Sequence, residues 1–116
     1  MKGDPIKLEE RVKAYLPKIR NQKIKARFIN GALLICQHGE WHGLVQFGRH
    51  SGIPVPKKGQ KIGGYAALCR TVVDHLRAAK IIDTGKETCF VNDLGTSLED
   101  HRYVLYLHPD LVKEAS

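Results

Sequence analysis

Acidic side chains are almost absent from residues 11–73 of this sequence. That stretch contains twelve Lys and Arg residues but a single carboxylate, Glu40, so its formal net charge is +11. The two flanking segments are slightly acidic, and the whole chain of 116 residues carries +7. Such an uneven distribution of charge indicates that the middle of the chain meets a polyanion, with nucleic acid favoured over an anionic membrane surface.

Long hydrophobic runs and cysteine motifs are also missing. No run approaches the length of a membrane span, and the first five residues lack the apolar core of a secretory signal. The three cysteines are an odd set without short spacing, which predicts reduced and buried thiols. We therefore expect a cytoplasmic protein with no membrane partner, folded as one domain over residues 1–116.

The motifs of the common enzyme classes are missing as well. No P-loop, no Gly-x-Ser-x-Gly and no Cys/His nucleophile arrangement is present. A metal-dependent nuclease needs clustered carboxylates, and the basic stretch has only Glu40. The sequence favours a binding protein without a cofactor. A small nuclease, either metal-dependent or using His38 and His42 as general acid and base, stays open as an alternative.

The N-terminal residues predict a helix followed by a basic run. Asp4-Pro5 is typical of a helix start, and Pro17 is expected to kink or end the helix. Five cations then follow within ten residues without an intervening acid: Lys18, Arg20, Lys23, Lys25 and Arg27. We interpret this run as an edge that contacts phosphates, with a solvated helix end as the alternative.

Asn30-Gly31 predicts a β-hairpin. An Asn-Gly pair between apolar runs is a strong hairpin signal, because both residues tolerate positive φ. Strand 25–29 is therefore expected to pair with strand 32–37, and the first of these would be a charged edge strand.

Residues 38–53 have an ambiguous periodicity. They fit either a short helix ended by Ser51-Gly52 or a third strand, and we favour the helix.

Residues 54–64 are expected to form a loop rich in Pro, Gly and Lys. Such a loop is suited to binding phosphates or, more simply, to a solvated connection. Apolar residues recurring at three and four then predict a helix over 64–80, in which Asp74 can pair with neighbouring arginines.

Two patterns near the middle of the chain can be explained either by ordinary packing and surface exposure or by a function. Cys36, His38 and His42 form C-x-H-x₃-H, and both histidines would share a helix face. The paired-cysteine spacing of zinc sites is absent, so no metal is predicted. Trp41 is expected in the core, with a stacking platform for single-stranded bases as the alternative.

The last third predicts a hairpin of β-strands. The segments 87–91 and 101–107 have strand composition, and the polar stretch 92–100 is expected to be the loop between them. Pro109 is expected to open a short helix that ends at Ser116.

This order of elements resembles a winged-helix domain over about residues 5–108. The resemblance implies an α+β fold with a three-helix core, an N-terminal strand or hairpin and a C-terminal two-stranded wing. The helix with the segments TGKETCFV and RYVLYLHPDL is also similar to the C-terminal winged-helix-like domain of conjugative-element relaxases, which implies a mobile element. The HGEW stretch departs from that family, so none of its functional residues are transferred.

If the winged-helix resemblance holds, the helix at 64–80 presents its N-terminal part to the major groove of DNA. Gln60, Tyr65, Arg70 and Thr71 would then lie nearest the base edges, and the basic run and the lysine loop would hold phosphates. The nucleic-acid-binding residues predicted in this way are Lys18, Arg20, Lys23, Lys25, Arg27, Arg49, Lys57, Lys58, Gln60, Lys61, Tyr65, Arg70 and Thr71.

The predicted wing loop is acidic. Asp93, Glu99 and Asp100 would be repelled by phosphate, so the wing is expected to stay off the DNA or to meet a protein partner. A protein–protein adaptor that uses this wing is therefore a further alternative. DNA is favoured over RNA, and the sequence leaves duplex or single strand and the oligomeric state open. Protonation of the histidines at 38, 42 and 50 below about pH 6.5 is expected to tighten binding.

Overall fold

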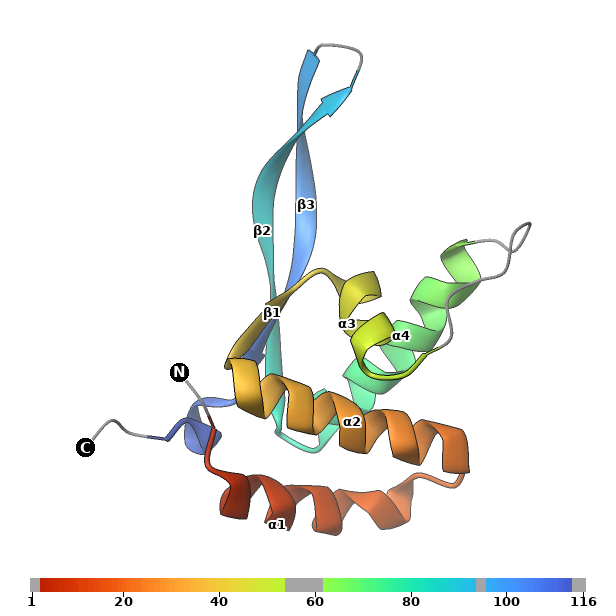
Figure 1. Cartoon of the computed structure of the whole chain (residues 1–116), viewed down its shortest axis with the longest axis vertical. Helices are drawn as coiled ribbons and strands as arrows, with labels where there is room; N and C mark the ends of the chain where they lie inside the picture. Colours follow the sequence, from red (N-terminus) through yellow and green to blue (C-terminus); the bar gives the residue numbers. More distant parts are fainter. Residues whose placement is uncertain (1–2, 54–61, 94–95, 114–116) are drawn as a thin grey trace.

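The computed structural model describes residues 3–53, 62–93 and 96–113, with side chains described for 3–53, 65–87 and 103–113. This part of the chain is α+β, with four α-helices and a three-stranded antiparallel sheet (Figure 1). The elements in chain order are α1 (Pro5–Tyr15), α2 (Gln22–His38), β1 (Glu40–His42), α3 (Leu44–His50), α4 (Ile62–Ala78), β2 (Ile82–Asp93) and β3 (Thr96–Leu107).

Helix α1 begins and ends as predicted. The Asp4 carboxylate accepts hydrogen bonds from the backbone N–H groups of Ile6 and Lys7, at 2.9 and 3.4 Å. The helix ends at Tyr15, and Pro17 lies in a 3-10 turn at Leu16–Lys18. Helix α1 lies alongside α2 and runs in the opposite direction (Figure 1).

The predicted hairpin around Asn30-Gly31 is wrong, because residues 22–38 form helix α2. The side chain of Asn21 caps this helix by accepting from the N–H groups of Lys23 and Ile24. Apolar residues at helical spacing, Phe28, Ala32 and Ile35, are completely buried.

Gly31 serves close helix packing in the middle of α2 instead of a turn. A Cβ atom at this position would lie 3.1 Å from the Phe47 ring and 3.3 Å from a Leu76 methyl group. The charged edge strand predicted at 25–29 is consequently also wrong, and its cations project from a helix.

The ambiguous stretch 38–53 contains both predicted alternatives in succession. Strand β1 comes first, Gly43 turns the chain with φ +98°, and helix α3 follows. The helix ends at Ser51-Gly52, as predicted, and the Ser51 hydroxyl donates to the Phe47 carbonyl at 2.8 Å.

Strand β3 is the central strand of the sheet, in the order β1-β3-β2. The β2–β3 pairing runs from Ile82↔Leu107 to Asp93↔Thr96. The predicted nine-residue loop 92–100 is therefore wrong, since most of it lies in paired strands. The far part of this pairing is a two-stranded ribbon of polar composition, which lacks the apolar alternation by which a strand is recognised in a sequence. The hairpin projects far from the helices (Figure 1).

The two ends of the described chain lie together. Gly3 pairs with Val112, and the Asp4 N–H donates to the Leu111 carbonyl at 2.8 Å. The helix predicted from Pro109 to Ser116 is a 3-10 turn at Pro109–Leu111, and residues 114–116 lie outside the described residues.

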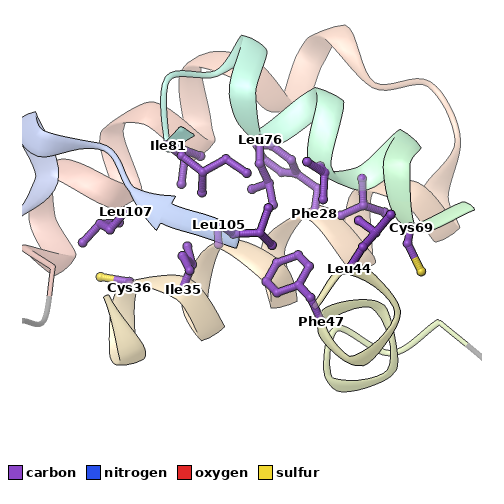
Figure 2. Close-up of a cluster of buried hydrophobic side chains, with 14 of the residues drawn as sticks. Phe28, Ile35, Cys36, Leu44, Phe47, Cys69, Leu76, Ile81, Leu105 and Leu107 are labelled. Carbon is purple, nitrogen blue, oxygen red and sulfur yellow. The ribbon is translucent and has the colours of Figure 1, made fainter. Parts of the chain in front are cut away.

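The core joins α2, α3, α4 and the base of the sheet (Figure 2). Fully buried side chains at its centre are Phe28, Ile35, Phe47, Leu76, Ile81 and Leu105. Each contributes about 1.5–3 kcal/mol by leaving water. Cys36 and Cys69 are buried and free, as predicted, and burial raises the pKa of both thiols. No helix within the described residues is long and apolar enough to cross a membrane.

Candidate nucleic-acid interface

Helix α4 buries one face and leaves the opposite face open. Cys69, Val72 and Leu76 lie in the core, as their spacing predicts, while Ala67 and Arg70 are exposed on the other side. The first turns of α4 extend past α2 and α3, at the end of the molecule away from the chain termini (Figure 1). This outward face is accessible to a large partner.

Two arginines from different helices meet α4 at Tyr65. The charges of Arg49, at the end of α3, and of Arg27, in α2, both act on the Tyr65 hydroxyl and lower its pKa, against the larger effect of burial. Arg27 also influences the thiol of Cys69, one turn further along α4. Positive groups that are distant in the sequence therefore come together beside the first turns of α4.

Tyr65 itself is not available to a ligand, so its predicted role at the base edges is wrong. Its side chain is only 4% exposed, and its hydroxyl donates to the Ile53 carbonyl at 3.0 Å. Burial raises the pKa of this hydroxyl despite the nearby arginines. Tyr65 instead holds the end of the 51–53 turn against α4 and positions Arg49.

Helix geometry divides the predicted basic run. Lys23 and Arg27 are four residues apart and share one side of α2, and the charge of Arg27 acts on Cys69 of α4. Lys25 lies roughly 160° around the helix axis from Arg27, on the side that faces α1. Lys18 places its ammonium group over the Tyr15 ring, 5.5 Å from the centroid, and Arg20 is exposed in the α1–α2 connection.

We call the group of Lys23, Arg27 and Arg49 the cationic edge. None of the three forms an ion pair with a carboxylate among the residues that the structure describes. Four further predicted contacts, Lys57, Lys58, Gln60 and Lys61, lie outside the described residues.

The two remaining predicted contacts lie on the outward side of α4. Arg70 is exposed, and within the described chain it forms no ion pair, so the expected pairing with Asp74 is absent. Thr71 is partly exposed, and its hydroxyl donates to the Ala67 carbonyl at 3.0 Å.

The histidines do not have the arrangement expected from the sequence. His38 ends α2 and His42 ends β1, so they do not share a helix face. The structure has no group of three or more His, Cys, Asp or Glu side chains suited to a metal ion within the parts of the chain that it describes. His38 and His50 instead pack against Trp41, with ring centroids 5.2 and 4.9 Å from the indole.

His42 is held between carboxylates at the base of the sheet. Its Nδ1 lies 2.7 Å from a Glu87 oxygen, and its Nε2 lies 3.5 Å from a Glu40 oxygen. The hydrogen bond to Glu87, supported by Glu40, raises the pKa of His42. The two carboxylates neutralise the positive charge of His42 locally. This geometry therefore does not favour the prediction that protonation of His42 tightens phosphate binding.

Leu68 of α4 is not singled out by the sequence pattern, and the structure leaves its side chain 46% exposed. Its spacing fits the apolar face of the helix, and its exposure follows only from where the other described elements lie. Trp41 packs against the core, as predicted.

In comparisons with protein-family models, curated proteins and solved structures, nothing matches this chain. Its function is therefore argued from its own geometry and charge.

Proposed function

We propose that this protein binds duplex DNA through the outward face of α4 and the cationic edge, in the manner of a winged-helix domain. From α2 onward the elements follow the order helix, strand, helix, helix, strand, strand, and the first strand pairs with the last. This order is compatible with a winged-helix layout, in which α4 is the helix that enters the major groove. Helix α1 is an addition in front of that layout.

The observation that carries the proposal is the position of Arg27 and Arg49 beside the first turns of α4, with Lys23 one turn before Arg27 on the same side of α2. A helix inserted into the major groove is flanked by phosphates on both sides, so cations next to its first turns are suited to contact them. The three side chains come from α2 and α3 and have no carboxylate partners in the described chain, which leaves their charge for an external anion. Guanidinium groups also match phosphate geometry with two donors.

The distal half of the β2–β3 hairpin is proposed to stay away from the phosphates. The strand pairs Phe90↔Glu99 and Cys89↔Asp100 put two acidic residues there, and Asp93 is at the last described pair of β2. A wing of this charge differs from one that grips the minor groove. The second candidate function is that of an adaptor, in which the acidic hairpin would bind a basic protein.

The test is fluorescence anisotropy with a labelled random-sequence 20-base-pair DNA duplex, the corresponding single strand and an RNA duplex, each at 50 and 200 mM salt. We expect DNA duplex to bind tightest. Three phosphates neutralised by the cationic edge give a log–log salt slope of about −2.7 or steeper. No binding to the DNA duplex at 50 mM salt, or equal affinity at both salt concentrations, contradicts the proposal.

The same labelled duplex also separates the binding function from the nuclease alternative. Incubation with the protein and Mg²⁺, and in parallel with a chelator, is expected to leave the duplex intact. Cleavage in either mixture would instead support the metal-dependent or the histidine-based nuclease, according to whether the chelator prevents it.

A further inference from the structure

The outward face of α4 has exposed apolar side chains in its second turn, where the proposed function would put a polar groove against it, and the exposed Asp74 lies further along the same face. Ala67 is exposed and Leu68 is 46% exposed, although large apolar side chains are usually covered in a small domain. The two residues lie in the second turn of α4. Exposed leucines are common on their own, so the argument depends on what surrounds this one.

Thr71 continues this apolar surface. It lies three residues after Leu68 and four after Ala67, so the three share one side of the helix. Its hydroxyl hydrogen is used in the 3.0 Å bond to the Ala67 carbonyl, which leaves the γ-methyl group and the oxygen lone pairs for contact with a ligand. The row consists mainly of methyl groups and spans roughly 6 Å along the helix axis.

Arg70 lies between these residues in the sequence and is exposed on the flank of this face next to Ala67, roughly 160° around the helix axis from Leu68. Its guanidinium group has no ion-pair partner among the described residues. A planar guanidinium group is suited to the two acceptors, N7 and O6, of a guanine in the major groove. The face therefore combines one directional donor group with an adjoining set of methyl groups.

Thymine is the base whose major-groove edge is apolar. Its C5-methyl group projects into that groove, where alanine and threonine methyl groups are known to meet it. A row of roughly 6 Å corresponds to about two base-pair steps, since successive bases of a strand are about 3.4 Å apart along the duplex. No cation of the edge can make this distinction, because phosphates are the same at every step.

We infer that α4 selects thymine methyl groups through Ala67, Leu68 and Thr71, next to a guanine contacted by Arg70. This inference rests on the proposed duplex binding. The site is thus a reader of short steps that contain thymine followed or preceded by guanine. Leu68 is its specificity-determining residue, because it supplies the largest exposed apolar side chain of the row.

The experiment begins with selection of bound duplexes from a randomised 20-base-pair DNA library by the full-length protein. The tightest-binding duplex is then synthesised twice, once with thymine and once with uracil, which differs only by the missing methyl group. The wild-type protein is expected to bind the uracil duplex about fourfold more weakly for each methyl group contacted. Leu68→Ala is expected to bind the thymine duplex more weakly and to lose most of the difference between the two probes.

Lys23→Gln is the matched control. It removes one charge of the cationic edge, so it should weaken binding to both duplexes by the same factor and keep their ratio. Equal affinity of the wild-type protein for the two probes, selected sequences without thymine, or an unchanged ratio in Leu68→Ala would each overturn the inference while leaving duplex binding standing. If the selection retains no duplex, the proposed function fails and the inference fails with it.

Discussion

Arg11 and Lys13 of helix α1 are paired, whereas the cations of the cationic edge are not, among the residues that the structure describes. Arg11 donates to the Lys80 carbonyl and forms an ion pair with Asp110 at 3.2 Å, and Lys13 pairs with Glu9 at 3.0 Å. Lys23, Arg27 and Arg49 have no carboxylate partner in the described residues. The same residue types therefore have two environments. Arg11 joins α1 to the turn at Pro109–Leu111 and Lys13 pairs within α1, whereas the charge of the cationic edge has no carboxylate partner in the described residues. Under the proposed function, this unpaired charge is the part that meets phosphate.

Reversing charge in the cationic edge is the strongest test of this difference. The double variant Lys23→Glu, Arg49→Glu is expected to weaken duplex binding roughly 100-fold and to reduce the log–log salt slope by about 1.8, because two phosphate contacts are lost. Its midpoint of chemical denaturation should change little, since both side chains are exposed. Binding is measured by anisotropy and stability by urea denaturation. An unchanged affinity would show that the phosphates lie elsewhere.

The helix packing beneath Arg49 can be disrupted by a substitution that changes no charged residue. A Cβ atom at Gly48 would clash with the Cys69 sulfur, so helices α3 and α4 meet closely there. Gly48→Val is expected to lower the free energy of unfolding by about 1–3 kcal/mol through overpacking. The control Gln46→Val adds the same side chain at an exposed position of α3. Equal stability of the two variants in urea denaturation would contradict the close packing of these helices.

Removing a paired cation should lower the stability of the fold and leave duplex binding unchanged, which is the opposite of the effect expected from the charge reversal. Arg11→Gln loses the ion pair to Asp110 and the hydrogen bond to the Lys80 carbonyl, so we expect about 1 kcal/mol lower unfolding free energy. Duplex affinity should stay within twofold of the wild type. A large loss of binding in this variant, with stability retained, would mean that α1 belongs to the interface.

The smallest expected effect concerns the paired histidine of the sheet. The neighbouring Glu87 and Glu40 raise the pKa of His42 above its ordinary value of 6.5. A group whose pKa rises on folding stabilises the fold fully below its unfolded pKa, and this stabilisation is lost as pH rises through the folded value. The melting temperature of the wild type should therefore exceed that of His42→Gln most at pH 5.5, and the gap should narrow by pH 8.5. A gap that is constant or widens with pH would contradict the pairing.

The two long helices show how far the sequence predicts this fold. Helix α4 could be predicted, because Cys69, Val72 and Leu76 recur at helical spacing without a competing turn signal. Helix α2 could not, because Asn30-Gly31 has the local signature of a hairpin turn. Only the approach of Phe47 and Leu76 shows why glycine is needed there, and that contact joins segments distant in the sequence.

The candidate site was predictable in its charge and not in its arrangement. The count of basic residues pointed to a polyanion, but the sequence did not separate Lys25 from Arg27, because their sides differ only once the segment is helical. Tyr65 was mistaken for a contact, since burial depends on the turn that covers it. Leu68 was overlooked for the reverse reason, since its exposure depends on the absence of a covering helix.

The most direct test is to map the amide chemical-shift changes of the labelled full-length protein as a random-sequence 20-base-pair duplex is added. The changes are expected to concentrate in the first half of α4, at Lys23 and Arg27 in α2 and at Arg49 in α3, with little change in α1. Changes centred on α1 or on the distal β2–β3 hairpin, with α4 unaffected, would contradict the assignment of unpaired cations to the binding site.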